Sequence, residues 1–295
     1  MRKARSSSPA KPSLPSEEFD MQNLKNKVAL VSGSGRGIGR AIALKLARHG
    51  AKVVVNDVDE EPGRAVAEEI KSAGGEAVAI NGSVTDQGFP DRFVGAAMES
   101  FGGLDVIVNN AGYTWDSTIQ KMTDEQFQAM LDVHLVAPFR ILRAAAEPIR
   151  VMAKREAEAG QEVFRKIVNI SSIAGLYGNA GQASYSAAKA ALIGLTRTLC
   201  KEWGRYKVNV NCVAFGLIRT RLTQPIEASQ ATIDIAGRSI KVGVQPHLLS
   251  TFEKLIPVGR SGTPEEAAGA VYLFCSPESN YISGQVIVCG GGLLM

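Results

Sequence analysis

The chain has 295 residues, 45% of them hydrophobic and 21% charged, which supports a large core and excludes a wholly disordered protein. Its net charge of +4 is too small for a dedicated nucleic-acid binder, and no apolar run is long enough to span a membrane. The four cysteines are scattered and no secretory signal is evident, so we expect reduced thiols in a cytoplasmic protein. The three histidines lack H-x-x-x-H spacing, so no metal site is expected.

Residues 1–23 differ in composition from the rest of the chain. Serine, proline and charged residues dominate the segment MRKARSSSPAKPSLPSEEFD, which cannot bury enough apolar surface to become ordered. We therefore predict a disordered N-terminal tail. A targeting or tethering role is the alternative, although the segment lacks the amphipathic, arginine-rich pattern of a transit peptide. Residues 24–295 are expected to form one domain.

From Lys27 onward, short apolar segments alternate with segments of helical periodicity. Strands that are apolar throughout, separated by helices, are typical of a parallel sheet buried on both faces. The pattern predicts an α/β fold: a Rossmann-like, doubly wound, seven-stranded parallel sheet with helices on both faces. The expected strands are VALV, KVVVND, EAVAIN, LDVIVNNAG, FRKIVNISS, KVNVNCVAFG and SGQVIVCGG, and the expected helices cover 38–50, 62–73, 89–101, 123–157, 184–203 and 264–275.

Two segments are long for connections in a compact domain, residues 151–165 and 221–260. Long segments at the carboxyl ends of parallel strands commonly line or cover a binding site. We expect the second to be a substrate lid, whose apolar residues suggest a roomy or apolar substrate site. A surface insertion that packs on a neighbouring subunit is the alternative. The apolar residues of this segment include Ile226, Ile233, Ile235, Leu248, Leu249 and Phe252.

A glycine-rich turn, SGSGRGIG at Ser32–Gly39, joins the first expected strand to the first helix. Glycines permit a tight turn and close approach of the backbone to a ligand. The N-terminus of the following helix offers unpaired N–H groups and the positive end of the helix dipole, which suit a pyrophosphate. Because the turn lies between a strand and a helix, it predicts a dinucleotide site. The candidate cofactor contacts here are Gly33, Arg36, Gly37, Ile38 and Gly39.

An acidic residue, Asp57, ends the second expected strand, twenty-four residues after Gly33. A carboxylate there accepts hydrogen bonds from the adenosine ribose of NAD and repels the 2′-phosphate of NADP. The following residues, Val58 to Glu61, contain no Arg or Lys that could hold a phosphate. NAD is therefore expected in preference to NADP. A plain helix-leading cap is the alternative role for Asp57.

Ser172, Tyr185 and Lys189 form the candidate catalytic group. Tyr185 and Lys189 are four residues apart on an expected helix, so they lie on one face, one turn apart. A neighbouring ammonium favours the phenolate and is expected to lower the pKa of the tyrosine towards neutrality, which suits proton exchange with a substrate oxygen. Ser172 precedes Tyr185 by thirteen residues, at a strand end where its hydroxyl can hold the same oxygen. Alone, the Y-x-x-x-K spacing is more often structural; its combination with the serine and the glycine-rich turn favours catalysis.

These motifs together resemble the classical short-chain dehydrogenase/reductase family, over Leu24–Met295. Within the family, Gly175–Lys189 is similar to 3-oxoacyl-carrier-protein reductases and to the (3R)-hydroxyacyl-CoA dehydrogenase domain of peroxisomal multifunctional enzymes. The resemblance is carried by S-G-x-x-x-G-x-G at Ser32–Gly39, N-N-A-G at Asn109–Gly112, S-x12-Y-x-x-x-K at Ser172–Lys189 and FGLIRT at Phe215–Thr220.

The resemblance implies a role for each matched residue. It makes Tyr185 the general acid/base, Lys189 the residue that holds the nicotinamide ribose and lowers the pKa of Tyr185, and Ser172 the residue that orients the substrate carbonyl. The other implied contacts are all to the cofactor. They are Ser83 and Val84 at the adenine, Asn110, Ala111 and Gly112 beside the riboses, Ile218 at the nicotinamide carboxamide through its backbone, and Thr220 near the phosphates or the amide.

His134 departs from the family pattern. The family has an asparagine in the helix after the fourth strand, where it helps to hold a water that relays protons out past the lysine; here LDVHLVAPF places His134 at that position. A histidine can donate and accept in a similar way, which makes His134 a candidate catalytic residue in the relay. A packed helix histidine, with the relay made otherwise, is the equal alternative. Ser83, Phe215 and Cys289 also replace the usual family residues, which are Asp, Pro and Asp.

The resemblance implies an NAD(P)-dependent oxidoreductase that moves a hydride between the nicotinamide and a secondary alcohol or ketone. The favoured substrate is a 3-hydroxyacyl/3-oxoacyl thioester, carried on coenzyme A or acyl carrier protein. A steroid or other bulky secondary alcohol is the alternative substrate, and a non-catalytic dinucleotide-binding scaffold is the alternative class of protein. The family also implies a homotetramer, assembled through the final strand with Gly290–Gly292 and through the helices after strands four and five.

Overall fold

The computed structural model describes residues 23–221, 223, 232–235, 238–241 and 246–293. The predicted N-terminal tail therefore lies outside the described residues, apart from Asn23. In the predicted lid, the same holds for Ile226 and for the side chains of Ile233, Ile235, Leu248 and Leu249.

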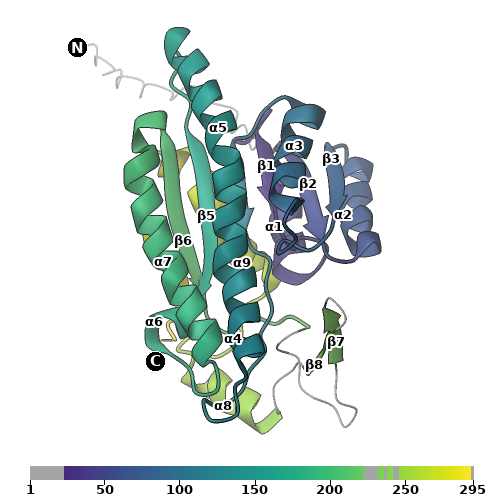
Figure 1. Ribbon diagram of the computed structural model, residues 1–295, viewed down its shortest axis with the longest axis vertical. Helices are drawn as coiled ribbons and strands as arrows, with labels where there is room; N and C mark the ends of the chain where they lie inside the picture. The colour runs from purple at the N-terminus through teal and green to yellow at the C-terminus, as the bar shows by residue number, and fades with distance from the viewer. Residues whose placement is uncertain (1–22, 222, 224–231, 236–237, 242–245, 294–295) are drawn as a thin grey trace, which may run out of the picture.

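Seven parallel strands form the central sheet, in the order β3-β2-β1-β4-β5-β6-β9 (Figure 1). The registers bring the strand ends together: Ser172, the last residue of β5, is aligned with Phe215, the last residue of β6. The predicted fold class is thereby confirmed. The strands are β1 (Val28–Val31), β2 (Lys52–Asp57), β3 (Ala77–Asn81), β4 (Val106–Asn109), β5 (Arg165–Ser172), β6 (Val208–Phe215) and β9 (Val286–Cys289).

Helices cover both faces of this sheet, because successive side chains of a strand point to opposite faces. In β1, Ala29 and Val31 are buried with residues of α1, α2 and α9 on one face. Val28 and Leu30 are buried with residues of α3 and α5 on the other face, where α7 also packs. The helices are α1 (Gly37–Arg48), α2 (Glu60–Ser72), α3 (Phe89–Phe101), α4 (Asp124–Leu131), α5 (Ala137–Glu158), α7 (Ala183–Trp203) and α9 (Pro264–Cys275).

The order of the strands positions the site. It reverses between β1 and β4, so the connections after these two strands leave in opposite directions and open a crevice at the carboxyl edge of the sheet. The glycine-rich turn follows β1 and the N-N-A-G segment follows β4. The two motifs that are far apart in sequence therefore meet at this crevice.

Several elements differ from the sequence-based expectation. The predicted helix over 123–157 contains one π-helical turn, η1 (Asp132–Val136), between α4 and α5. A short helix, α6 (Ile173–Tyr177), follows β5 directly. The lid region contains a helix, α8 (Pro246–Leu255), and an antiparallel hairpin of β7 (Thr232–Ile235) and β8 (Arg238–Lys241).

The expectation that residues 151–165 line the binding site is wrong. Helix α5 continues to Glu158, because the segment is rich in alanine, lysine, arginine and glutamate, which favour a helix. The few residues that remain lead into the amino end of β5, at the edge of the sheet opposite the crevice. None of the segment's residues lines the cavity described below.

Candidate active site

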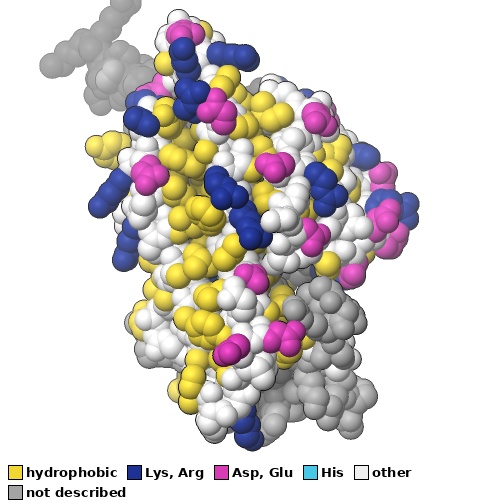
Figure 2. All heavy atoms as spheres, in the orientation of Figure 1, with side chains coloured by type: hydrophobic (Ala, Val, Ile, Leu, Met, Phe, Trp, Pro, Cys, Tyr) yellow, Lys and Arg dark blue, Asp and Glu magenta, His cyan; other side chains and the backbone are white. Residues whose placement is uncertain are grey.

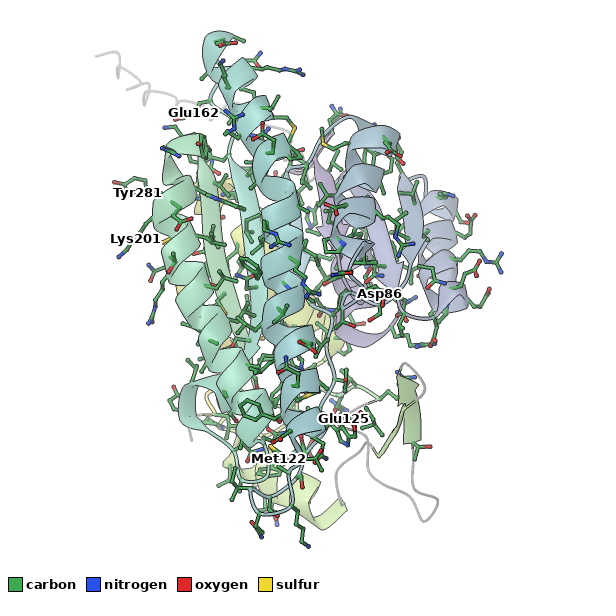
Figure 3. The ribbon with its side chains drawn as sticks, viewed as in Figure 1. Asp86, Met122, Glu125, Glu162, Lys201 and Tyr281 are labelled. Carbon is green, nitrogen blue, oxygen red and sulfur yellow. The ribbon has the colours of Figure 1, made fainter. Side chains whose placement is uncertain are left out.

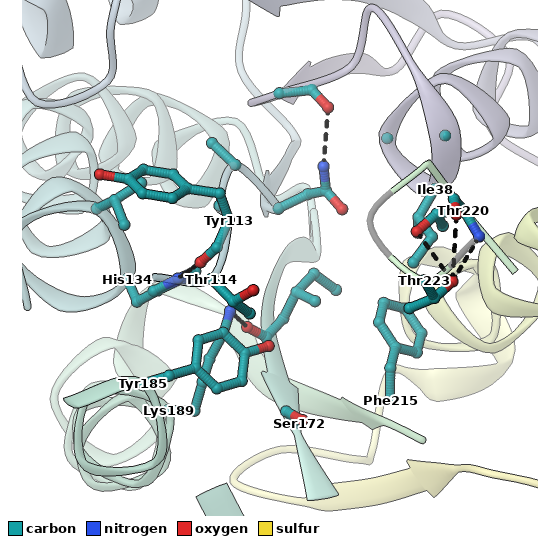
Figure 4. A pocket seen from close by; sticks show the side chains of 18 of the residues that line it. Ile38, Tyr113, Thr114, His134, Ser172, Tyr185, Lys189, Phe215, Thr220 and Thr223 are labelled. Carbon is teal, nitrogen blue, oxygen red and sulfur yellow. Dashed lines mark hydrogen bonds between the residues drawn. The ribbon is translucent and has the colours of Figure 1, made fainter. Parts of the chain in front are cut away.

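A cavity of about 1230 Å³ occupies the crevice at the carboxyl ends of the strands (Figure 4). Every candidate catalytic and cofactor-binding residue named from the sequence lines it. The residues that follow β2 and β3 lie at one end, and those from β4, β5 and α7 lie at the other. The structure therefore brings the predicted residues together in a single elongated site.

The glycine-rich turn has the backbone geometry that its sequence predicts. Gly33 and Gly37 have φ angles of 61° and 52°, in the left-handed region that favours glycine. A Cβ on Gly39 would overlap the carbonyl oxygen of Gly33, so the turn folds tightly against the start of α1. The Asn110 side chain donates to the carbonyl oxygens of Ser32 and Gly33, at 3.0 Å each. The segment after β4 thus fixes the backbone of the turn.

The start of α1 fits the phosphates of a dinucleotide. Its N-cap residue, Arg36, has an extended backbone, and no side chain in the described part of the chain caps the first turn, so its N–H groups remain for a ligand. Thr220 forms the opposite wall, with its Cγ2 3.8 Å from where a Cβ on Gly37 would lie. Thr223, which the sequence analysis missed, holds this wall: its hydroxyl accepts from the Thr220 N–H at 2.8 Å and donates to the Ile218 carbonyl at 2.6 Å. The sequence signal that could have identified Thr223 is a threonine within a turn, because its hydroxyl commonly hydrogen-bonds the backbone of that turn.

Asp57, the last residue of β2, lies at the β2 end of the cavity, with 7% of its surface exposed. Its Oδ1 accepts a hydrogen bond from the Asp59 N–H at 3.1 Å. Arg36 reaches the same group: its Nη1 lies 3.6 Å from Asp57 Oδ1 and 2.7 Å from Asp59 Oδ2. The sequence argument that no cation could hold a phosphate here was therefore incomplete. It considered only residues after β2, whereas the cation comes from the glycine-rich turn.

Ser172, Tyr185 and Lys189 meet at the other end of the cavity (Figure 4). Ser172 Oγ accepts from the Ala174 N–H at 3.2 Å and also shares a hydrogen bond with Tyr185. Lys189 Nζ lies 5.6 Å from the centroid of the Tyr185 ring and donates to the carbonyl oxygen of Ile170 at 2.6 Å. The spacing in the sequence thus correctly predicts that the three side chains are neighbours.

Burial controls the ionisation of this group. It raises the pKa of Tyr185 from 10.0 to about 12, although the hydrogen bond with Ser172 acts in the opposite direction. It also lowers the pKa of Lys189 from 10.5 to about 8. The expectation that Lys189 brings the pKa of Tyr185 towards neutrality is therefore wrong for this structure, because desolvation is the larger effect and the ammonium bonds the Ile170 carbonyl. The phenol is neutral at pH 7 and is a proton donor.

His134 lies in the π-helical turn η1, a feature that is common at functional sites, and is only 2% exposed. Its Nε2 is 2.7 Å from the carbonyl oxygen of Tyr113, which assigns the hydrogen to Nε2. Its Nδ1 is buried and has no hydrogen-bond partner among the described residues. Burial, with the charge of Lys189, holds the pKa of His134 well below 6.5. The imidazole is therefore neutral, and Nδ1 is a free acceptor beside Tyr185, whose ring centroid lies 4.9 Å away.

A hydrogen-bonded group that the sequence did not indicate lies at the catalytic end. Gln182, the N-cap residue of α7, donates to Asp116 Oδ2 at 2.8 Å and accepts from Asn179 Nδ2 at 3.0 Å. The Ser117 N–H donates to the Gly181 carbonyl at 2.9 Å, so the segments after β4 and before α7 are joined. Burial raises the pKa of Asp116. No sequence pattern relates Asp116 to a partner 66 residues away.

Comparison with known proteins gives matches over most of the chain. A family model described as Enoyl-(Acyl carrier protein) reductase matches residues 33–294. The 3-oxoacyl-[acyl-carrier-protein] reductase of Synechocystis sp. is 38% identical over 277 residues, which are 93% of this chain and 100% of that protein. The peroxisomal hydratase-dehydrogenase-epimerase of Saccharomyces cerevisiae is 37% identical over 80% of this chain, but the match covers 24% of that protein. A solved double mutant of a Serratia marcescens short-chain dehydrogenase/reductase has a TM-score of 0.77 at 28% identity, covering 92% of this chain and 99% of that one.

The family model and the relatives show an oxidoreductase that acts on CH–OH groups with NAD(P), and the cavity holds its candidate cofactor-binding and catalytic residues. The chain belongs to the short-chain dehydrogenase/reductase family. The family resemblance drawn from the motifs is therefore confirmed, including the similarity to 3-oxoacyl-carrier-protein reductases and to a multifunctional peroxisomal enzyme.

Proposed function

We propose that the chain is an NAD-preferring oxidoreductase of 3-hydroxyacyl and 3-oxoacyl thioesters. The observation that carries the proposal is one cavity with Ser172, Tyr185 and Lys189 at one end and Asp57 at the other. Its volume of about 1230 Å³ exceeds the size typical of a site for one small ligand, so a dinucleotide and a substrate fit together. The name of the Synechocystis relative, a 3-oxoacyl-[acyl-carrier-protein] reductase, supports the 3-oxoacyl substrate.

The bound nicotinamide would supply or accept the hydride. In the reductive direction, the hydroxyl groups of Ser172 and Tyr185 hold the substrate carbonyl oxygen. Tyr185 passes its proton to that oxygen as the carbonyl carbon becomes a carbinol. The phenolate left on Tyr185, with the Lys189 ammonium 5.6 Å from the centroid of its ring, then regains a proton.

The substrate class is tested by comparing kcat/KM across a panel. The panel holds 3-oxoacyl thioesters of coenzyme A and of acyl carrier protein, a ketosteroid and a simple ketone, each with NADH and NADPH. We expect the thioesters to have the highest kcat/KM, since the Synechocystis relative, which matches 93% of this chain, is named as a 3-oxoacyl-[acyl-carrier-protein] reductase. A ketosteroid that is turned over faster would favour the alternative substrate, and a protein that binds NAD but turns over no member of the panel would favour the scaffold.

The cofactor preference is tested at Asp57. Wild-type kcat/KM should be higher with NAD than with NADP. Because the Asp57 carboxylate repels a 2′-phosphate, Asp57→Ala should reduce the ratio of kcat/KM with NAD to kcat/KM with NADP by about tenfold. Asp105→Ala is a matched control, since Asp105 pairs with Lys27 away from the cavity. A higher wild-type kcat/KM with NADP would contradict the preference.

We propose further that the chain assembles as a homotetramer. Strand β9 lies at the edge of the sheet, and its Val288 exposes apolar surface, as does Leu273 of α9. Tyr281 projects away from the body of the molecule at the same side (Figure 3). Phe127 of α4 and Phe139 of α5 are also exposed, and Figure 2 shows hydrophobic side chains gathered over α5 and α7. Two separate apolar faces suit a tetramer with perpendicular two-fold axes.

Light scattering should give a mass about four times the chain mass of 31.3 kDa. Val288→Lys places a charge on the exposed side of β9, so this variant should dissociate into dimers. Asp91→Lys on α3, outside both apolar faces, should remain tetrameric. A wild-type protein that is a stable monomer at micromolar concentration would refute the assembly.

Two observations bear on the cellular setting. All four cysteines are free thiols, which fits a reducing compartment such as the cytoplasm. Within the described ranges, no helix is both long and apolar enough to cross a membrane. The name of the Synechocystis relative supports acyl carrier protein as the carrier of the substrate, and coenzyme A is the alternative carrier.

A further inference from the structure

Two groups of side chains that differ in polarity flank Ser172 in the cavity. Ser172 ends β5, which lies between β4 and β6 in the sheet. On the β4 side, the hydrogen-bonded group of Asp116, Asn179 and Gln182 lines the cavity. On the side of β6 and β9, an apolar group lines it, made of Leu217, Phe252 and Leu293. A substrate carbonyl with one polar and one apolar substituent fits this difference when its polar substituent lies on the β4 side.

Asp116 places a carboxylate close to Tyr185 on the β4 side. Its Oδ2 accepts a hydrogen bond from Gln182 Nε2 at 2.8 Å. Gln182 precedes Tyr185 by three residues at the start of α7, so their side chains are neighbours. Besides burial of the phenol, the charge of Asp116 raises the pKa of Tyr185. The electric field of this carboxylate therefore extends to the hydroxyl that holds the substrate oxygen in the proposed reaction.

No cation among the described residues pairs with Asp116. Its side chain is exposed and lines the cavity, so it stays ionised at pH 7, although partial burial raises its pKa. Three cations also line the cavity, but Lys189 donates to the Ile170 carbonyl, Arg36 pairs with the acids that follow β2, and Arg221 belongs to the connection after β6. The β4 side of the catalytic end therefore carries a negative charge that no neighbour neutralises.

We infer that Asp116 is a specificity-determining residue, which excludes free 3-oxo acids and admits their uncharged acyl derivatives. The inference rests on the proposed function, because it places the substrate carbonyl oxygen at Ser172 and Tyr185. In a 3-oxoacyl compound, one methylene separates the reacting carbonyl from the polar C1 group, which therefore lies on the β4 side. A carboxylate at C1 meets the like charge of Asp116 within a cavity, where solvent screens charges less than at a surface. A thioester or ester carries no charge there and is not repelled.

Asp116→Asn removes the charge and keeps the geometry. The asparagine Oδ1 can still accept from Gln182 Nε2, and the Ser117 N–H still donates to the Gly181 carbonyl, at 2.9 Å in wild type. The segments after β4 and before α7 therefore remain joined. Asp124→Asn is the matched control, because Asp124 lies in the same connection, is exposed and does not line the cavity. The melting temperature of each variant shows whether the fold is retained.

The experiment compares acetoacetate with methyl acetoacetate, which differ in the charge at C1. The kcat/KM for reduction of each is measured with the reduced cofactor that wild type uses better. Wild type should prefer the methyl ester by more than about tenfold, and Asp116→Asn should raise kcat/KM for acetoacetate by about tenfold, because a like charge beside the substrate charge is removed. The same variant should change kcat/KM for the methyl ester by less than about threefold, and Asp124→Asn should change neither value by more, since its exposed charge is screened.

Four results would overturn the inference. They are a wild type that reduces acetoacetate as efficiently as the ester, no gain for acetoacetate in Asp116→Asn, an equal gain for the ester in that variant, and an equal gain for acetoacetate in Asp124→Asn. The proposed function is judged separately, from the wild-type protein and the thioesters. A wild type that reduces thioesters and acetoacetate equally well keeps the proposed function and loses the inference, whereas one that reduces no 3-oxo compound contradicts both.

Discussion

Replacing Tyr185 with phenylalanine is expected to lower kcat by about a thousandfold, within the range that general acid–base catalysis contributes, while the affinity for NAD changes little. The phenyl ring remains edge-on to His134, so only the transferable proton and the hydrogen bond with Ser172 are lost. Steady-state kinetics and an NAD titration measure the two effects. Tyr177→Phe is the matched control, because Tyr177 of α6 is 47% exposed and does not line the cavity. If Tyr185→Phe keeps more than about a tenth of wild-type kcat, a barrier change below about 1.4 kcal/mol, the acid/base assignment fails.

The pH dependence of the reaction follows from the raised pKa of Tyr185. With a pKa of about 12, the phenol keeps its proton throughout pH 6 to 9, so the supply of the proton donor for reduction is constant there. Alcohol oxidation needs the phenolate, whose fraction rises tenfold per pH unit below the pKa. The rate of oxidation should therefore increase with pH in wild type, and Tyr185→Phe should lose that increase. An oxidation rate that is level in wild type would show that another group accepts the proton.

The sheet could be predicted from the sequence because its strands contain short, continuous apolar runs, such as VALV in β1 and VVV in β2. All four residues of β1 are buried, which is the pattern of a strand covered on both faces. The site followed from this prediction, since parallel strands place their carboxyl ends at one edge. Ser172, Tyr185 and Lys189 could be grouped because a strand end and one helical turn fix their relative positions.

Features that depend on distance through space could not be predicted. Arg36 was named as part of a turn, but its pairing with Asp59 requires knowing how closely the turn approaches the end of β2. The pKa of Tyr185 was predicted too low, because the sequence shows that a lysine is near but does not show how deeply the tyrosine is buried. The π-helical turn at Asp132–Val136 was also missed, since one widened turn leaves the apolar periodicity of 123–157 nearly unchanged.

That turn determines how His134 contacts the site. A Cβ on Gly112 would overlap the His134 ring, so the imidazole fills the space beside the N-N-A-G segment. With Nε2–H donating to the Tyr113 carbonyl, Nδ1 presents its lone pair in a buried position near Lys189 and Tyr185. A lone pair fixed in this way can accept a hydrogen bond from a water or from the lysine ammonium. These contacts favour a proton relay, whereas the close packing alone is equally consistent with a structural histidine.

His134→Ala should lower kcat by about tenfold with little change in the dissociation constant of NAD, because the relay and not the cofactor site loses a group. The pKa of His134 lies well below 6.5, so the imidazole is neutral from pH 6 to 9 and the loss should be a constant factor across that range. His134→Asn, which restores an acceptor, should recover much of the activity. His134→Phe restores the volume without a nitrogen and should not. Equal kcat for the phenylalanine variant and wild type, in a protein with an unchanged melting temperature, would show that His134 only fills its place in the helix.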